Sequence, residues 1–186
     1  MTLQNETFTV TIRAVDTDLR RFGNFDAVYF QEDAAQECSK SHVLIIRDSS
    51  RERRIALVGS LFIYEEHCAV LEGDVLTILQ NNRLVRIDLQ TAQVSQIVMI
   101  EAFGGNYEIH KLPHGYLVYG ECQITFYDEH LTLTWDFSGN DIFASLSEKP
   151  AFSLKPDTIL LYDFEGTLYE LDFNGQLLRT EKETAL

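Results

Sequence analysis

An aspartate recurs three times at the end of an apolar segment, and the spacing of these aspartates constrains the fold more than any other feature. The segments 83–87, 123–127 and 167–171 are followed by Asp88, Asp128 and Asp172. The aspartates lie 40 and 44 residues apart, and each leads into a turn and a second strand-like segment. A repeat of this length is typical of a small four-stranded sheet. The chain is therefore predicted to be built of repeated sheets.

The apolar residues of these segments are not confined to alternate positions. In the last copy, Leu168, Tyr169 and Leu171 put apolar side chains on both faces of one strand. Burial on both faces is expected when each small sheet packs between two neighbours, whereas a sandwich strand alternates more cleanly. We therefore predict an all-β fold, a small or incomplete β-propeller-like array of four-stranded antiparallel blades.

Turn signals divide the chain into four units. Clear repeats are predicted at about 67–101, 107–140 and 151–182, and a less regular first unit at 7–65. Asp48 lies 40 residues before Asp88, which leaves open that the first unit holds a degenerate copy. No Pro- or Ser-rich linker divides the chain, so residues 1–186 are expected to form a single β domain. The alternating segment 8–14 is expected to pair with a sheet formed by distant residues, where it would protect an exposed edge.

The turns after the aspartates carry a further pattern. Asp172 is followed by Asn174-Gly175, whereas the copy at Asp88 has Ala92 in the glycine position, and the copy at Asp128 lacks the glycine but reaches Trp135. This pattern, over roughly residues 67–182, resembles the repeat of quinoprotein-type β-propellers. In that family an apolar strand reaches an aspartate, a Thr-Gly or Asn-Gly turn follows, and the outer strand often ends in tryptophan. The resemblance implies a propeller-like fold and carries no implication about a quinone cofactor. The quinoprotein enzymes need more blades than this chain supplies.

The charge of the chain limits its partners. It carries 29 acidic and 15 basic side chains, a net charge of −14. Nucleic acid is not expected as a partner, because phosphate binding depends on lysine and arginine. A basic protein is the complementary partner, although the charge also fits a role in solubility alone. The acidic residues in loops and turns that we predict to bind such a partner are Glu65, Glu66, Asp128 and Glu129.

Residue types able to carry chemistry occur without the spacing that chemistry needs. His110 and His114 are four apart near Glu108, but Pro113 indicates a loop rather than the helix that would align two metal ligands. Cys122 adjoins Glu121, and a neighbouring carboxylate raises the pKa of a thiol, so we do not expect a nucleophile.

The three repeated aspartates are expected to accept hydrogen bonds from their own turns rather than to converge as acid and base, since catalytic residues do not recur once per structural unit. Phosphate-loop, GxSxG and HExxH motifs are absent from the sequence. We expect no catalytic residue, no cofactor and no metal site.

The cysteines and the apolar segments bear on location. Cys38, Cys68 and Cys122 are widely spaced with no CxxC among them, which is typical of reduced thiols. The first residues lack the basic start and apolar run of a secretory signal, and no apolar segment approaches the roughly 20 residues of a membrane span. A cytoplasmic protein that binds no membrane is expected.

The leading functional interpretation is a non-enzymatic protein-binding module whose acidic surface recognises a basic partner, as an inhibitor or immunity-type protein does. The alternative is a small-molecule-binding propeller or a minor enzyme that uses the central face. Clustered acidic loops would favour the first, and a pocket with converging histidine and glutamate would favour the second. The sequence leaves enzymatic activity and the oligomeric state open.

Overall fold

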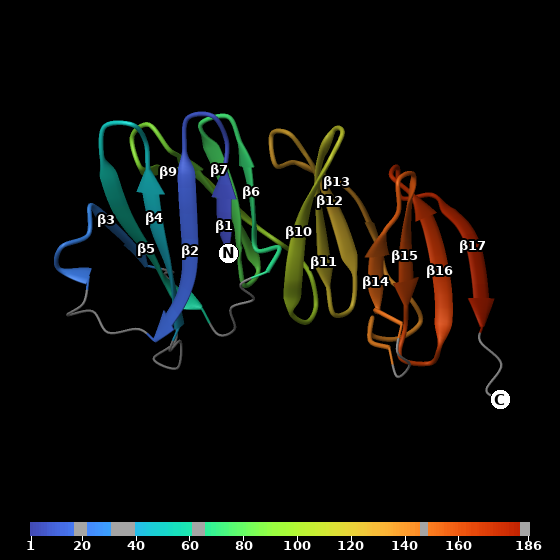
Figure 1. Ribbon diagram of the computed structural model, residues 1–186. Coiled ribbons are helices and arrows are strands. Elements are labelled where there is room, and N and C mark those ends of the chain that lie inside the picture. The colour runs from blue at the N-terminus through green and yellow to red at the C-terminus, as the bar shows by residue number, and fades with distance from the viewer. Residues whose placement is uncertain (17–21, 31–39, 61–65, 146–148, 183–186) are drawn as a thin grey trace. The chain divides into compact units, whose positions relative to one another are not determined.

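The fold consists of β-sheets. The computed structural model describes residues 1–16, 22–30, 40–60, 66–145 and 149–182, and its regular elements are the seventeen strands of four sheets (Figure 1). Neighbouring strands are antiparallel except for one parallel pair. The predicted all-β fold class is confirmed. No helix in the described part of the chain is long and apolar enough to span a membrane.

The sheets fall into two compact units, residues 1–100 and 101–186, each with two sheets. The first sheet has the order β1 (Thr2–Gln4), β2 (Thr9–Asp16), β4 (Lys40–Arg47), β5 (Glu52–Ser60), β3 (Ala27–Phe30). The second sheet contains β6 (Ala69–Glu72), β7 (Val75–Gln80), β8 (Arg83–Asp88) and β9 (Gln93–Met99).

The second unit repeats the arrangement of the second sheet twice. Its third sheet contains β10 (Asn106–Leu112), β11 (Gly115–Gly120), β12 (Ile124–Asp128) and β13 (Leu133–Phe137). The fourth sheet contains β14 (Phe152–Leu154), β15 (Thr158–Tyr162), β16 (Thr167–Asp172) and β17 (Leu177–Lys182). In the second, third and fourth sheets the strands follow one another up and down in chain order, which is the topology of a propeller blade.

The first sheet is a degenerate blade with an insertion. Strands β1, β2, β4 and β5 also run up and down, but the connection between β2 and β4 contains β3, which crosses to the far edge and pairs in parallel with β5. Asp48 directly follows β4 and precedes β5, much as Asp88 ends β8 before β9. The first sheet therefore resembles the repeat of the other three.

The expectation that segment 8–14 pairs with a distant sheet is wrong. Strand β2 pairs with β1 and β4 of its own sheet, with Val10 opposite Ile46 and Ile12 opposite Leu44. The strand β4 offers a matching apolar face a few tens of residues along the chain. Closing that short connection costs less entropy than closing a long one.

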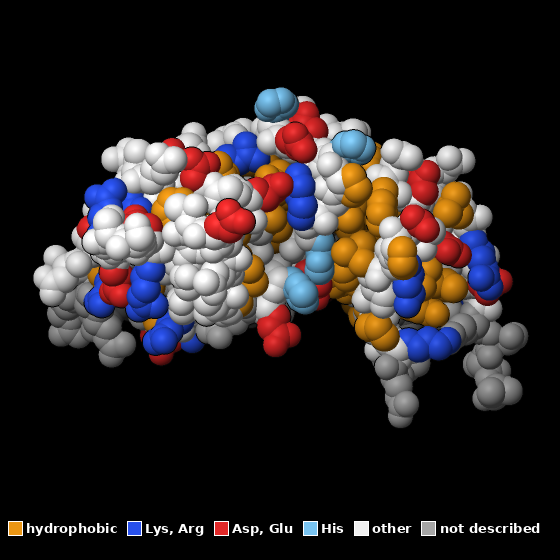
Figure 2. All heavy atoms as spheres, turned by 45° about the horizontal axis from the view of Figure 1, so that its top comes forward, with side chains coloured by type: hydrophobic (Ala, Val, Ile, Leu, Met, Phe, Trp, Pro, Cys, Tyr) orange, Lys and Arg blue, Asp and Glu red, His pale blue; other side chains and the backbone are white. Residues whose placement is uncertain are grey.

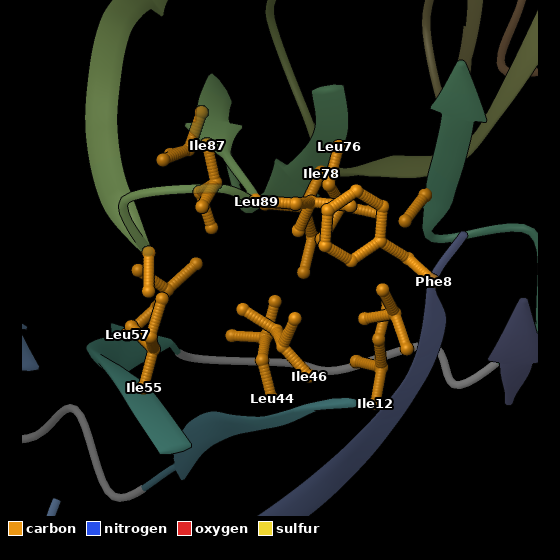
Figure 3. Packing of buried hydrophobic residues seen from close by; sticks show 14 of the residues in the cluster. Phe8, Ile12, Leu44, Ile46, Ile55, Leu57, Leu76, Ile78, Ile87 and Leu89 are labelled. Atoms are coloured by element: carbon orange, nitrogen blue, oxygen red, sulfur yellow. The ribbon is translucent and has the colours of Figure 1, made fainter. Parts of the chain in front are cut away.

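The core of the first unit lies between its two sheets (Figure 3). Strand β4 contributes Leu44 and Ile46, and β8 contributes Val85 and Ile87 from the opposite sheet. The other face of the first sheet is covered by its own insertion, whose Phe22, Phe25 and Val28 pack with the apolar side chains Val43, Ala56 and Val58. The degenerate blade thus buries both of its faces with residues of the same unit.

The core of the second unit is rich in aromatic rings. Phe126 and Trp135 stack with ring centroids 5.5 Å apart, and Tyr119 and Phe152 stack at 4.7 Å. Leu171 is fully buried in the same cluster, as the repeat pattern predicts. Leu168, on the opposite face of β16, is only partly buried. Tight packing of both faces therefore holds for the degenerate first sheet but not for the fourth.

The repeated aspartates cap their turns, as predicted. The Asp128 Oδ1 accepts hydrogen bonds from the backbone N–H groups of His130 and Thr132, both at 2.8 Å. The Asp172 Oδ1 accepts from Asn174 at 2.9 Å and Gln176 at 2.8 Å. These bonds, above all those from Thr132 and Gln176, stabilise the ionised carboxylates and hold the pKa of Asp128 and of Asp172 below its usual range.

The left-handed backbone conformation of this turn is kept in the two copies that lack glycine. Gly175 has φ +80°, and the matching positions in the other two turns are Leu131 at +61° and Ala92 at +58°. Side chains at positive φ are disfavoured by a clash between Cβ and the following carbonyl oxygen. Because Leu131 and Ala92 are both buried, apolar burial offsets that strain.

An arginine joins the aspartate turns of the two sheets in the first unit. The Arg53 side chain is only 5% exposed, and its Nη2 lies 3.1 Å from the Oδ2 of Asp48. Its Nη1 donates to the backbone carbonyl of Gln90, in the turn after Asp88, and the Nη2 of Arg51 donates to the same oxygen at 3.0 Å. Hydrogen bonds from Ser50, with those of Arg51 and the nearby Arg53 charge, lower the pKa of Asp48 to about 2 from the ordinary 3.8.

Acid should weaken this turn. Because the folded-state pKa of Asp48 lies below the unfolded value, its ionised form stabilises the protein above about pH 4, and that stabilisation is lost as the pH falls toward 2. Urea midpoints measured between pH 5 and pH 2 should therefore fall less steeply for Asp48→Asn than for the wild type. A control substitution at the exposed Asp157, Asp157→Asn, should keep the wild-type slope. Equal slopes for all three proteins would contradict the assignment.

Candidate functional site

The four acidic residues predicted to bind a partner are divided between the two units and a segment outside the described residues. Glu65 lies outside the described residues. Glu66 is exposed in the first unit, whereas Asp128 and Glu129 belong to the second. The Asp128 carboxylate is engaged by its turn, and a Glu129 carboxylate oxygen lies 3.6 Å from Lys111 Nζ. Their role in partner binding stays a prediction.

Two of the three residues considered as metal ligands do come together. On β10, the Glu108 Oε2 lies 2.7 Å from the His110 Nε2, and the His110 ring packs at 5.1 Å from that of Phe152. His114 is exposed in the turn between β10 and β11. Within the described ranges, no three His, Cys, Asp or Glu side chains are grouped so that they would hold a metal ion.

The thiol considered as a nucleophile is poorly suited to that role. Cys122 is partly buried in the turn between β11 and β12. Burial raises the pKa of its thiol, and the negative charges of Glu121 and Asp141 raise it further. Thiolate formation is therefore disfavoured at neutral pH. Cys68 is buried in the core of the first unit, and Cys38 lies outside the described residues.

The negative charge of the chain is concentrated in the second unit. Residues 101–186 carry 15 acidic and 5 basic side chains, whereas residues 1–100 carry 14 and 10. Several arginines of the first unit pair with carboxylates there, among them Arg47 with Glu52 and Arg53 with Asp48. The excess of negative charge is therefore greater in the second unit.

Four connections meet at one end of the two sheets of this unit and form what we call the acidic loop surface, made by Glu101, Phe103, Glu121, Asp141 and Phe164. Backbone hydrogen bonds join these connections. Glu121 N donates to the Gly105 carbonyl at 2.7 Å, Phe143 N donates to the Glu121 carbonyl at 2.6 Å, and Phe164 N donates to the Ile142 carbonyl at 2.9 Å. These hydrogen bonds link the connections to one another at the ends of the strands.

A glycine allows the first of these connections to approach the second. Gly104 has φ +85°, and a Cβ at this position would lie 2.8 Å from the Glu121 Oε2 and 3.1 Å from the Cys122 Sγ. The next residue, Gly105, donates its N–H to the same Glu121 oxygen at 3.2 Å. Phe103, the residue before Gly104, is 85% exposed.

The acidic loop surface combines two chemical properties. Carboxylates attract cations, and the face of an aromatic ring binds lysine or arginine through its quadrupole. Phe103 and Phe164 are among the exposed large hydrophobic side chains of the described residues, and Glu101 and Asp141 are exposed beside the same loop connections. Figure 2 shows acidic and hydrophobic side chains interspersed on the face that it presents. Carboxylates and exposed aromatic rings therefore occur together on the acidic loop surface.

Sequence reasoning missed this surface. Its residues come from connections around positions 101–105, 121, 141 and 164, and no local pattern links them. The available signal is the pair Gly104-Gly105 directly after a phenylalanine, and by itself that pair indicates only a loop between repeats.

Comparisons with known proteins give a limited result. No family model and no curated protein matches the chain. Among solved structures, the chain is similar to the crystal structure of BamB from Moraxella catarrhalis, with 12% sequence identity and a TM-score of 0.48. The match covers 98% of this chain and 52% of that one, so the chain spans about half the length of the protein that it matches.

Proposed function

We propose that this protein is a non-enzymatic binding module whose acidic loop surface recognises a basic protein, in the manner of an inhibitor or immunity-type protein. The observation that carries the proposal is the exposed Phe103, next in the chain to Gly104 where that residue closely approaches Glu121, within a unit that has 15 acidic and 5 basic side chains. We propose a cytoplasmic location. We also propose that the repeats are of the quinoprotein type, since the Asp172 turn keeps Asn174-Gly175 and the outer strand after Asp128 reaches Trp135.

The binding energy would come from a small number of contacts. A partner lysine or arginine over the Phe103 ring contributes roughly 0.5–2 kcal/mol, depending on how far it is desolvated. Glu101 and Asp141 would mainly accelerate the encounter, because exposed charges act over a Debye length of about 8–10 Å. Aromatic side chains near the centre of an interface commonly carry most of its affinity. Phe103 is therefore assigned the anchoring role and the carboxylates the steering role.

The partner can be isolated by affinity capture from the native host and its binding followed by surface plasmon resonance. The association rate constant should fall steeply as the salt concentration rises from 0.05 to 0.5 M, in line with charge screening. Glu101→Lys and Asp141→Lys should each slow association several-fold and change dissociation little. Phe103→Ala should mainly accelerate dissociation, by about tenfold or more.

A matched control lies at the opposite end of the same unit. Asp157 is exposed in the turn between β14 and β15, so Asp157→Lys makes the same charge change away from the acidic loop surface. It should affect association less than Glu101→Lys. Glu129→Lys tests the turn residues predicted from sequence in the same way. An association rate that does not change with salt, or that responds equally to all these reversals, would sink the assignment of this surface.

A second candidate function rests on the Glu108 and His110 pair. Their side chains converge at 2.7 Å beside Phe152, and both are partly exposed. Such a group suits a small polar ligand that forms hydrogen bonds with this pair beside an aromatic ring. A thermal-shift screen of small metabolites, repeated with Glu108→Gln, distinguishes this function from the first. Ligands that stabilise the wild type but not the variant would favour it.

A further inference from the structure

The last strand of the fourth sheet is an edge strand. In the described structure β17 pairs with β16 on one side, and all six of its residues are exposed, with Leu177 at 45% and Leu178 at 53%. The outer side of an edge strand presents backbone N–H and C=O groups that can pair with another strand. Burying the exposed leucines of such an edge against another molecule would be energetically favourable.

The first sheet shows how this chain covers the same edge elsewhere. There the equivalent outer strand, β5, is paired along its free side by β3 over four residue positions. In the fourth sheet, β17 corresponds to β5, and no described strand of this chain takes the position of β3. A strand supplied by another molecule would complete it in the way that β3 completes the first sheet.

The charges of β17 are complementary to those of a second, antiparallel copy of the same strand. Arg179 pairs in register with Glu170, and Glu181 with Leu168, so both charged side chains stand on one face of the sheet. Within one molecule Arg179 Nη2 and Glu181 Oε2 form an ion pair. When two β17 strands run antiparallel with Thr180 opposite Thr180, Arg179 of each copy lies opposite Glu181 of the other. The two-fold arrangement therefore makes two cross-strand ion pairs.

The outer strands of the second and third sheets lack this complementarity. Strand β9 has no charged residue, and β13 has only Asp136. Self-pairing at these edges would place no opposite charges together. Between two copies with a net charge of −14 each, local opposite charges at the contact are needed to offset the overall repulsion.

We propose that a second copy of this chain pairs with β17, forming a two-fold symmetric dimer whose two fourth sheets join into one continuous antiparallel sheet. The contact uses the backbone edge of β17 for affinity and the pairs of Arg179 with Glu181 for register. The contact uses β17 and none of Glu101, Phe103 and Asp141, so the dimer is proposed independently of the partner.

A charge-swap experiment tests the dimer. Sedimentation velocity of the full chain at 0.15 M salt should show a dimer whose fraction rises with protein concentration. Arg179→Glu and Glu181→Arg each place like charges opposite one another twice, and each should weaken the dimer by roughly tenfold. The double variant R179E/E181R restores opposite charges and should restore the dimer to near wild-type affinity.

Thermal melts by circular dichroism check that each variant is folded, and Lys155→Glu, a charge reversal in the exposed turn between β14 and β15, serves as the control that should leave the dimer intact. A wild-type protein that stays monomeric up to millimolar concentration overturns the proposal. So does a dimer that tolerates both single reversals, or one that the double variant fails to restore.

Discussion

Replacing Leu171 with alanine should lower the free energy of unfolding by about 2–5 kcal/mol, measured from urea denaturation curves at neutral pH. Leu171 is 0% exposed and lies on β16 in the cluster that joins the third and fourth sheets. Its removal forfeits the transfer free energy of the side chain and leaves a cavity among Ile159, Leu161 and the neighbouring aromatic rings. The close packing of those rings limits how far the cavity can collapse.

A leucine on the surface of the same unit provides the control. Leu133 lies on β13 with 48% of its side chain exposed, so Leu133→Ala should cost less than about 1 kcal/mol. The two substitutions remove the same atoms, and the difference between them measures the core packing between the sheets. A cost for Leu171→Ala no larger than that for Leu133→Ala would show that β16 has a different register.

The blade repeat could be predicted because its signal is local. Asp88, Asp128 and Asp172 each end an inner strand and cap the turn that follows, so spacing and turn chemistry agree with the structure. The sequence pattern did not reveal the backbone conformation of two turns. Ala92 and Leu131 look like departures from the glycine pattern, yet the backbone keeps the left-handed conformation at both, because burial offsets its strain.

The rest depends on contacts between distant residues, which a single sequence does not display. Strand β3 pairs in parallel at the far edge of the first sheet, and a four-residue apolar segment gives no indication of its partner. The acidic loop surface is likewise assembled from connections some sixty residues apart, joined by backbone hydrogen bonds such as Phe143 N to the Glu121 carbonyl. The net charge predicted binding to a basic partner. Only the fold shows where acidic side chains lie beside exposed aromatic rings.

Substituting Gly175 with alanine should destabilise the protein by about 2–4 kcal/mol. Gly175 has φ +80°, which costs a side chain roughly 1–2 kcal/mol in the left-handed region. An added Cβ would also lie 2.5 Å from the Cδ2 of Trp135, whose ring is stacked on Phe126 and cannot move freely. Trp135 is the single tryptophan of the chain, so its fluorescence reports the disturbance directly.

Substitution of Gly73 separates the cost of the backbone conformation from the cost of the clash with Trp135. It has φ +56° in the turn between β6 and β7, and a Cβ there would meet nothing within 4 Å. Gly73→Ala should therefore show the backbone cost alone, about 1–2 kcal/mol, and leave the Trp135 emission unchanged. In Gly175→Ala, replacement of Trp135 by leucine should recover part of the excess loss, because the smaller side chain leaves room for the Cβ. If Gly175→Ala costs no more than Gly73→Ala and the emission does not shift, Trp135 does not pack on this turn, and the aspartate turn of the fourth sheet would be held by its own hydrogen bonds alone.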